Sequence, residues 1–303
     1  MRAQHVFSLE SGKNKLLPHS LSQVNKGKYA MLEKPHLNSG EVVPLEALHE
    51  ETYGKVLCYP TYDLAELGRR AEELEELGVR TLEFTGEKSV LGVPVLGKGC
   101  VGIVVVATVS GRRVALKIRR ADANRKGMLR EAEMLSKANS VSVGPILIDA
   151  SQNFLVMEFI EGWPLPKWIE DSKKRAKPRI QRVLRAVLEQ CWRLDEIGLD
   201  HGQLSKALKH IIVRENDTPC IVDFETASNN RRASNVTSVC HYLFIGSQAA
   251  KIMTNGLGEV AREELIGALK EYKHKRMREN FEGILDIFGL HKIQMGDLRT
   301  ERI

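Results

Sequence analysis

Apolar residues recur along the chain with two different periods, which outline its helices and strands. In residues 61–80, "TYDLAELGRRAEELEELGVR", they return every three or four positions, as on one face of a helix. Asp63 and Glu66 are placed to cap the beginning of this helix, and Gly78 is placed to end it. The pattern predicts an amphipathic helix that covers an apolar surface elsewhere, and the segment that follows is the nearest candidate.

The pattern changes to that of strands between residues 88 and 119. The runs "SVLGVPVLG", "VGIVVVATV" and "RVALKIR" are rich in Val and Ile and are separated by glycine, which predicts three antiparallel strands. A helical stretch, "NRKGMLREAEMLSKAN", comes next, followed by the strand-like runs "GPILIDA" and "NFLVMEFI". Residues 1–54 show no sustained period, so we expect a flexible or loosely docked leader there.

From about residue 163 the chain is mainly helical. The segment "RIQRVLRAVLEQCWRLDEIG" carries one apolar stripe, and two short runs, "HIIV" and "CIVDF", flank a turn at "ENDTP". The stripe consists of Ile180, Val183, Leu184, Val187, Leu188 and Cys191. The order of elements therefore predicts an α+β protein with a strand-rich part that contains one helix, followed by a helical part that contains a hairpin.

Composition limits the class of protein without naming its function. The 303 residues are 43% apolar and 28% charged, as in ordinary soluble proteins, and the length suggests two domains or lobes. The net charge of +6 permits anionic partners without requiring one. Five scattered cysteines indicate neither a disulfide framework nor a zinc site. With no membrane-spanning run and no signal sequence, we expect a cytoplasmic protein.

Candidate phosphate-binding residues lie in the strand-rich part. Residues 97–104 read "GKGCVGIV", which places Gly97, Gly99 and Gly102 between two strand-like runs. Such a turn lets backbone N–H groups approach phosphate oxygens without interference from a side chain, although glycines also occur in turns that bind nothing. A strand rather than a helix follows, which excludes the dinucleotide-binding form of this loop.

Charged residues in apolar runs form the other candidates. Lys117 lies in "VALKI" and needs an anion if it is buried, although strand alternation leaves open that it faces solvent. Glu131 lies within the apolar stripe of the next helix, whereas Glu133 points away, so the pattern predicts a Lys117–Glu131 ion pair. Asp223 ends the run "CIVDF", where a carboxylate can hold a divalent cation or simply begin a turn.

These motifs follow the order found in the protein kinase superfamily, which the chain resembles over residues 88–228. The resemblance implies a kinase-like two-lobe fold with a helical N-terminal extension (55–87), an N-lobe (88–162) and a reduced C-lobe (163–303). The matching segments are "GKGCVGIV", "VALK", "REAEML", "LVMEFIEG", "HGQL" and "VDFE".

The resemblance also implies ATP and Mg²⁺ as cofactors. Lys117 would bind the α- and β-phosphates and be held by Glu131, and Asp223 would bind the metal. Met157 would be the gatekeeper, with backbone groups of Glu158 and Ile160 at the adenine edge. The implied nucleotide site comprises Gly97, Lys98, Gly99, Cys100, Gly102, Val104, Ala115, Lys117, Met157, Glu158 and Ile160.

The catalytic loop departs from the family pattern. His201 matches, but Gln203 stands where an Asp accepts the proton of the incoming hydroxyl. Asp200 is either a substitute carboxylate or a surface residue at a helix end. The metal-binding Asn expected at Leu208 is best replaced by His210, although imidazole is a poor ligand for magnesium.

Two further departures concern the segment after the metal aspartate. Glu225 makes the motif "DFE", as in the aminoglycoside and choline kinases, and could supply an additional metal oxygen. The chain then lacks an Ala-Pro-Glu motif and leaves little room for a large peptide-docking lobe. This short form is similar to the RIO kinases, to the kinase-like ATPase of the KEOPS tRNA-modification complex, and to the predicted serine/threonine kinases of archaea.

Several functions are compatible with these motifs. We expect an atypical serine/threonine protein kinase that also phosphorylates itself, because phosphoryl transfer depends mainly on positioning and charge and so tolerates a missing base. The alternatives are an ATPase or nucleotide-gated assembly factor, in which Gln203 orients a water, and an ATP-binding pseudokinase. A small-molecule kinase is a further option because of Glu225.

Partners are less defined by the sequence. The protein substrate is determined by surfaces outside these motifs. The basic runs "KKRAKPRIQRVLR" and "KEYKHKRMR" are either solvated helix faces or contacts for RNA, a ribosomal particle or an acidic substrate.

Overall fold

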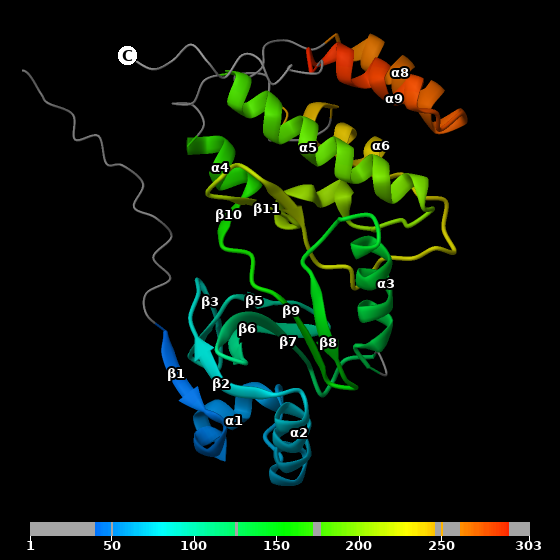
Figure 1. The fold of residues 1–303 in the computed structure, drawn as a ribbon. Helices are drawn as coiled ribbons and strands as arrows, with labels where there is room; N and C mark the ends of the chain where they lie inside the picture. Colours follow the sequence, from blue (N-terminus) through cyan, green and yellow to red (C-terminus); the bar gives the residue numbers. More distant parts are fainter. Residues whose placement is uncertain are drawn as a thin grey trace, which may run out of the picture. The chain divides into compact units, whose positions relative to one another are not determined.

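The computed structural model describes residues 40–49, 51–124, 127–171, 177–245, 250 and 261–290. Its N-terminal part is built on one antiparallel sheet in the order β1-β2-β6-β7-β9-β8, with β5 added beside β6 (Figure 1). The helix α3 (Leu129–Asn139) packs next to the edge strand β8. The strands are β1 (Glu41–Pro44), β2 (Val79–Phe84), β5 (Gly97–Lys98), β6 (Gly102–Val109), β7 (Arg112–Arg119), β8 (Leu147–Ala150) and β9 (Phe154–Glu158).

The two faces of this sheet pack against different parts of the protein, and the side chains of β7 point alternately to one face and the other. Val114, Leu116 and Ile118 belong to a buried apolar cluster on the face that the N-terminal extension covers. Ala115 and Lys117 point to the opposite face, toward α3 and the C-terminal part. Because both faces are covered, a lysine in the middle of β7 is removed from solvent.

The N-terminal extension packs tightly against the sheet. It consists of η1 (Leu45–His49), α1 (Glu51–Leu57) and α2 (Leu64–Glu76), and the apolar face of α2 buries Leu67 and Leu74. The expected cap is present, because the Asp63 carboxylate accepts a hydrogen bond from the Glu66 backbone N–H at 2.7 Å. Gly78 follows the helix with a φ of +70°, a conformation that glycine adopts without strain.

A buried arginine ties this extension to the sheet. Arg70 of α2 is completely buried, and its guanidinium donates hydrogen bonds to the carbonyl oxygens of Leu57 and Arg119, the latter at 2.7 Å. The charge is compensated by the Glu66 carboxylate at 2.6 Å. Arg70 therefore connects α1, α2 and the end of β7 in a single hydrogen-bonded unit.

The structure corrects the expected boundaries of the extension. Residues 41–44 form β1, which pairs with β2, so the described end of the predicted leader belongs to the sheet. Residues 79–84 are a strand within the segment that was expected to be helical. A four-residue strand carries too little alternation to be recognised, and its pairing with β2 supplies the missing stabilisation. Residues 1–39 of the predicted leader lie outside the described residues.

The strands between residues 88 and 98 also differ in detail. β3 (Lys88–Val90) and β4 (Val93–Val95) form a separate two-stranded hairpin, and only β5 continues into the main sheet. The predicted strands over "VGIVVVATV" and "RVALKIR" are confirmed as β6 and β7, whereas the first predicted strand, over residues 89–97, is wrong because most of that run forms the β3-β4 hairpin.

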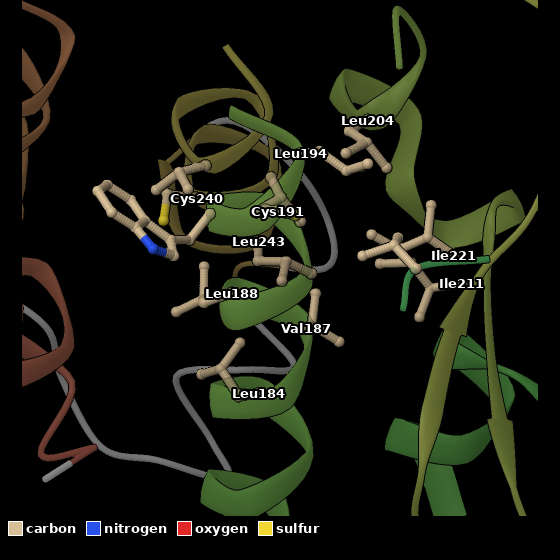
Figure 2. Packing of buried hydrophobic residues seen from close by; sticks show 14 of the residues in the cluster. Leu184, Val187, Leu188, Cys191, Leu194, Leu204, Ile211, Ile221, Cys240 and Leu243 are labelled. Atoms are coloured by element: carbon tan, nitrogen blue, oxygen red, sulfur yellow. The ribbon is translucent and has the colours of Figure 1, made fainter. Parts of the chain in front are cut away.

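The C-terminal part is mainly helical around α5 (Lys177–Glu196). Figure 2 shows Leu184, Val187, Leu188, Cys191 and Leu194 of α5 packed between Cys240 and Leu243 on one side and the hairpin residues Ile211 and Ile221 on the other. The predicted stripe is confirmed, and each such side chain contributes about 1.5–3 kcal/mol by burial. The other elements are β10 (Gly162–Pro164), α4 (Leu165–Asp171), η3 (Leu204–Lys209), β11 (Ile211–Arg214), β12 (Pro219–Ile221), α6 (Asn235–Cys240), the π-helical turn η4 (His241–Ile245), α8 (Arg262–His274) and α9 (Arg278–Ile287).

The predicted α+β class and two-lobe organisation are confirmed by this arrangement. The lobe of antiparallel strands carries one helix, α3, and the lobe of helices carries the β10-β11-β12 sheet (Figure 1). None of the helices in the described ranges is long and apolar enough to cross a bilayer.

Candidate functional site

Lys117 lies at the centre of a cluster of carboxylates. Its Nζ is 2.9 Å from Glu131 Oε1, 2.9 Å from Asp223 Oδ1 and 3.1 Å from Glu225 Oε2. Only 6% of the Lys117 side chain is exposed, which rules out the solvent-facing alternative. The predicted Lys117–Glu131 ion pair is confirmed, and the structure adds two carboxylates from the other lobe.

Three separate elements supply these groups. Lys117 comes from the middle of β7, Glu131 from the first turn of α3, and Asp223 and Glu225 from the segment after β12. Asp223 has a φ of +71°, which turns the chain sharply out of the strand. Phe224 anchors this turn, because it is buried with its ring 4.9 Å from that of His201.

The electrostatics of the cluster favour an additional cation. One ammonium faces three carboxylates, so these four groups together carry a net charge of −2 when all of them are ionised. Burial lowers the pKa of Lys117, but the three carboxylates outweigh burial and raise this pKa above its usual value. Burial raises the pKa of Asp223, but Lys117 outweighs it and the carboxyl pKa falls below its usual value.

The glycine-rich turn lies directly against Lys117. The Gly99 N–H donates to the Gly102 carbonyl oxygen at 2.8 Å and closes the turn between β5 and β6. A Cβ at Gly102 would lie only 3.1 Å from Cε and Cγ of Lys117. Glycine at this position therefore leaves room for the extended lysine side chain.

Two cations and the Tyr59 ring pack beside the glycine-rich turn between β5 and β6. The Lys98 ammonium lies 4.6 Å from the centre of the Tyr59 ring, and the Arg120 guanidinium lies 4.9 Å from it. Arg120 also donates to the Gly99 carbonyl oxygen at 3.1 Å. Lys98, which was expected to meet the nucleotide, is thus in contact with the N-terminal extension, while Cys100 at the tip of the turn is exposed.

The residues expected around adenine lie on neighbouring strands. Ala115 pairs with Met157, and Val104 pairs with both Gly97 and Lys117. Ile160 is buried.

Glu158, at the end of β9, already has partners for two of its groups. Its N–H donates to Ile146 at 2.8 Å, and its carboxylate is 2.7 Å from Arg214 of β11. Any contact of Glu158 with adenine is therefore limited to its carbonyl oxygen.

His201 supports the catalytic loop from within. Its ring Nε2 lies 3.1 Å from the Val222 carbonyl oxygen, and its backbone N–H donates to Asn235 Oδ1 at 2.9 Å. Burial lowers the pKa of His201 to about 4. A buried neutral imidazole with these contacts orients the loop, which places the half-buried Gln203 two residues later.

Asp200 is not the surface residue of the second expected alternative, because it is buried. Its carboxylate accepts a hydrogen bond from Arg231 Nε at 2.8 Å, and its backbone forms an isolated bridge with Ser228. Arg231 also donates from Nη2 to the Thr226 carbonyl oxygen at 2.6 Å, and a Cβ at Gly202 would lie 2.5 Å from that Nη2 atom. Arg231 thus joins the catalytic loop to the segment that follows Glu225.

Oxygen atoms suited to magnesium are present, but Lys117 lies between them. Within the described ranges no group of three or more His, Cys, Asp and Glu residues is arranged to hold a metal ion. Asp223 and Glu225 offer oxygen ligands of the type that magnesium prefers. His210 Nδ1 lies 3.5 Å from Asp223 Oδ2, so His210 adjoins the aspartate that was expected to bind the metal, but it offers nitrogen. The carboxylates fit a divalent cation if the lysine turns toward phosphates.

A second buried network organises the C-lobe and was not foreseen. The Asp195 carboxylate accepts hydrogen bonds from Asn235 Nδ2 at 2.8 Å and from the Tyr272 hydroxyl at 2.9 Å. Asn235 then accepts from the His201 N–H. A signal existed, because Asp195 follows Cys191 by four residues and so extends the apolar stripe of α5.

Comparison with protein families supports this interpretation of the geometry. Residues 108–235 match the RIO domain. The matched segment includes Lys117, Glu131, His201, Gln203 and Asp223, and it relates the chain to an atypical, protein-kinase-like family, as the resemblance implied. The two-lobe arrangement is consistent with a RIO-kinase-like fold. No curated protein matches the chain.

Proposed function

We propose that this protein is an atypical serine/threonine kinase that transfers the γ-phosphate of ATP to a protein hydroxyl, including its own. The observation that carries the proposal is the buried Lys117 ammonium, held at 2.9 Å by both Glu131 of α3 and Asp223 after β12. A strand lysine linked in this way to a helix glutamate and a metal aspartate is the arrangement that protein kinases use to position phosphates.

The cluster explains how a nucleotide and a metal would be held. Lys117 would turn toward the phosphates while Glu131 keeps hold of its ammonium, and the absence of side chains at Gly99 and Gly102 would let the phosphates approach the backbone of the turn. Asp223 and Glu225 would then separate from the Lys117 ammonium and offer their oxygens to Mg²⁺. Bound Mg²⁺ would neutralise the charge that develops on the phosphates.

Transfer in this protein would depend on positioning rather than on a loop carboxylate. Asp200 is the only acidic residue between Leu199 and Lys209, and Arg231 already pairs with it. The Gln203 amide oxygen can accept a hydrogen bond from an incoming hydroxyl, but it cannot remove the proton. Because general-base help contributes about 10²–10⁴-fold, we expect slow transfer rather than none.

The same observation favours ATP hydrolysis as the second candidate. A glutamine amide can orient a water toward the γ-phosphate, as glutamine does in some GTPases. With Asp200 occupied by Arg231, the loop has no free carboxylate that would favour a protein hydroxyl over water. An ATPase would use the same Lys117 and Asp223.

One experiment separates these functions. The protein is incubated with γ-labelled ATP and Mg²⁺, with and without an added protein acceptor, and labelled protein and free phosphate are measured separately. The Lys117→Ala and Asp223→Ala variants should abolish labelling, whereas Lys137→Ala, which removes an exposed lysine paired with Glu133, should not. Release of phosphate without labelled protein would favour the ATPase, and ATP binding without either product would indicate a pseudokinase.

We also propose a cytoplasmic location. All five cysteines are free, which suits a reducing compartment.

A further inference from the structure

Two basic segments that are distant in sequence, residues 231–232 and residues 273–276, are joined by hydrogen bonds on the surface of the C-lobe. The Arg232 guanidinium donates to the Lys273 carbonyl oxygen, and the Arg276 guanidinium donates to the Ala233 carbonyl oxygen. Each segment therefore supplies an arginine to the backbone of the other. We call the resulting set Arg231, Arg232, Lys273, Lys275 and Arg276 the basic surface.

Four of these five cations form no ion pair with a carboxylate among the described residues, although Arg276 acts electrostatically on the buried carboxyl of Asp195. Arg231 pairs with Asp200, but in the part of the chain that the structure describes no carboxylate lies within ion-pair distance of Arg232, Lys273, Lys275 or Arg276. The first three of these four side chains are exposed and Arg276 is half-buried. Bringing like charges together costs free energy, and an anion that binds there would relieve the repulsion.

The dipole at the C-terminal end of α8 accounts for only some of the cations in the basic surface. Lys273 lies in the last turn of α8, where the negative end of the helix dipole favours a cation. Arg232 comes from the segment after Glu225, far from α8 in sequence, so the helix dipole gives no reason for its presence. The charge is thus assembled by the tertiary fold.

The basic surface begins beside the catalytic loop. Arg231 bonds to Asp200 and to the Thr226 carbonyl oxygen, and its Nη2 lies so near Gly202 that a Cβ there would be 2.5 Å away. Gly202 directly precedes Gln203, which would meet the acceptor hydroxyl. A segment bound along the basic surface would therefore pass close to the site of transfer.

We propose that the basic surface docks an acidic segment of the protein substrate next to its acceptor serine or threonine; this inference rests on the proposed function. Arginine and lysine pair readily with carboxylates and phosphoryl groups. Single-stranded nucleic acid is disfavoured, because base stacking requires exposed aromatic rings and Tyr272, the only Phe, Trp or Tyr in residues 226–234 and 270–278, is buried.

The test measures binding without catalysis. Fluorescence anisotropy measures the binding of three labelled ligands: a short peptide rich in Glu and Asp around one serine, a Lys-rich counterpart, and a single-stranded RNA. The titrations contain no ATP and are done at low and at high salt. The Lys273→Glu/Lys275→Glu variant should weaken binding of the acidic peptide by about tenfold or more. High salt should weaken it in the wild type.

A matched control carries the same change in charge elsewhere. Arg80→Glu/Lys88→Glu reverses two exposed cations of the N-terminal half and should leave peptide binding unchanged. Thermal unfolding of both variants shows whether each is folded. Equal loss in both variants, or unchanged binding in Lys273→Glu/Lys275→Glu, would overturn the proposal, as would RNA binding tighter than the acidic peptide.

Failure of the docking proposal and failure of the proposed function give different results. Asp223→Ala should still bind the acidic peptide, because Asp223 lies outside the basic surface. Peptide binding without any phosphoryl transfer would leave the docking surface intact and refute the kinase. Transfer to a serine peptide regardless of acidic neighbours would keep the kinase and refute the docking surface.

Discussion

Arg231 and Asp200 form an ion pair with a distance of 2.8 Å between Nε and Oδ2, and this pair joins the segment after Glu225 to the catalytic loop. The Asp200 side chain is 13% exposed and that of Arg231 is 50% exposed. A carboxylate that is nearly buried and bonded to a guanidinium is held in one position. Asp200 is therefore suited to hold the loop in place rather than to accept a proton.

Asp200→Asn tests this role. If Asp200 only positions the loop, the substitution lowers kcat modestly and leaves the shape of the pH–rate profile unchanged. A catalytic base would instead give an acidic limb that disappears in Asp200→Asn. Arg231→Lys should retain part of the activity that Arg231→Ala loses, because lysine keeps the charge but not both hydrogen bonds.

Gln203→Asp should increase phosphoryl transfer to a protein hydroxyl. A carboxylate at this position can remove the proton that the amide cannot, which is worth about 10²–10⁴-fold in kcat. Quench assays with labelled ATP would measure labelled acceptor and free phosphate separately. Gln203→Asn serves as the control without a base, and an unchanged rate of transfer in Gln203→Asp would show that the base position does not limit this protein.

Gly102→Ala should weaken ATP binding. The new Cβ would lie 3.1 Å from Cε and Cγ of Lys117 and 3.0 Å from the Ile118 carbonyl oxygen, so either the lysine or the turn must move. Overpacking of this kind costs about 1–3 kcal/mol, or about five- to 150-fold in affinity.

Isothermal titration calorimetry with ATP would measure the change. The matched control is Gly68→Ala in α2, where a Cβ meets nothing within 4 Å and should raise stability slightly. Equal ATP affinity in the two variants would contradict the assigned contact.

Acid should destabilise the protein through His201. Burial lowers its pKa to about 4, against 6.5 for the free side chain. Between these values the unfolded chain binds a proton that the folded chain does not, so the free energy of unfolding falls as pH decreases from about 6.5 to about 4. The difference of about 2.5 units corresponds to about 3 kcal/mol.

Urea unfolding at pH 7.5 and pH 5 would measure this loss. His201→Asn should be less stable at neutral pH but should show a smaller decrease on acidification. His210, whose pKa burial also lowers, contributes to the same range of pH, so His210→Asn is the second comparison. An equal decrease in the wild type and His201→Asn would show that His201 does not titrate as described.

The central ion pair was predictable because two local patterns agree. Lys117 interrupts an apolar strand and Glu131 interrupts an apolar helix face, and the two positions together indicated a buried pair, although strand alternation alone left Lys117 free to face solvent. Asp223 and Glu225 also contact Lys117, but periodicity could not predict this. They come from the other lobe, 106 and 108 residues later in the chain. The order of kinase motifs, rather than the physics of either segment, indicated Asp223.

The ion pair between Asp200 and Arg231 could not be predicted from the sequence. Asp200 and Arg231 are 31 residues apart in irregular segments, where no period relates one position to another. The strand β1 was missed for a related reason, since its pairing with β2 depends on chain folding rather than on its own four residues. Asp195, in contrast, could have been found by continuing the α5 stripe by one helical turn.

The buried Arg70 limits where the N-terminus of this protein can be truncated. The RIO match begins at residue 108, inside β6, and so leaves out the helix that carries this arginine. A fragment cut at that point would expose Val114 and Leu116 to water and leave the Arg119 carbonyl oxygen without its guanidinium. The matched segment is thus shorter than the packed unit, and we expect a stably folded protein to require the extension that contains Arg70.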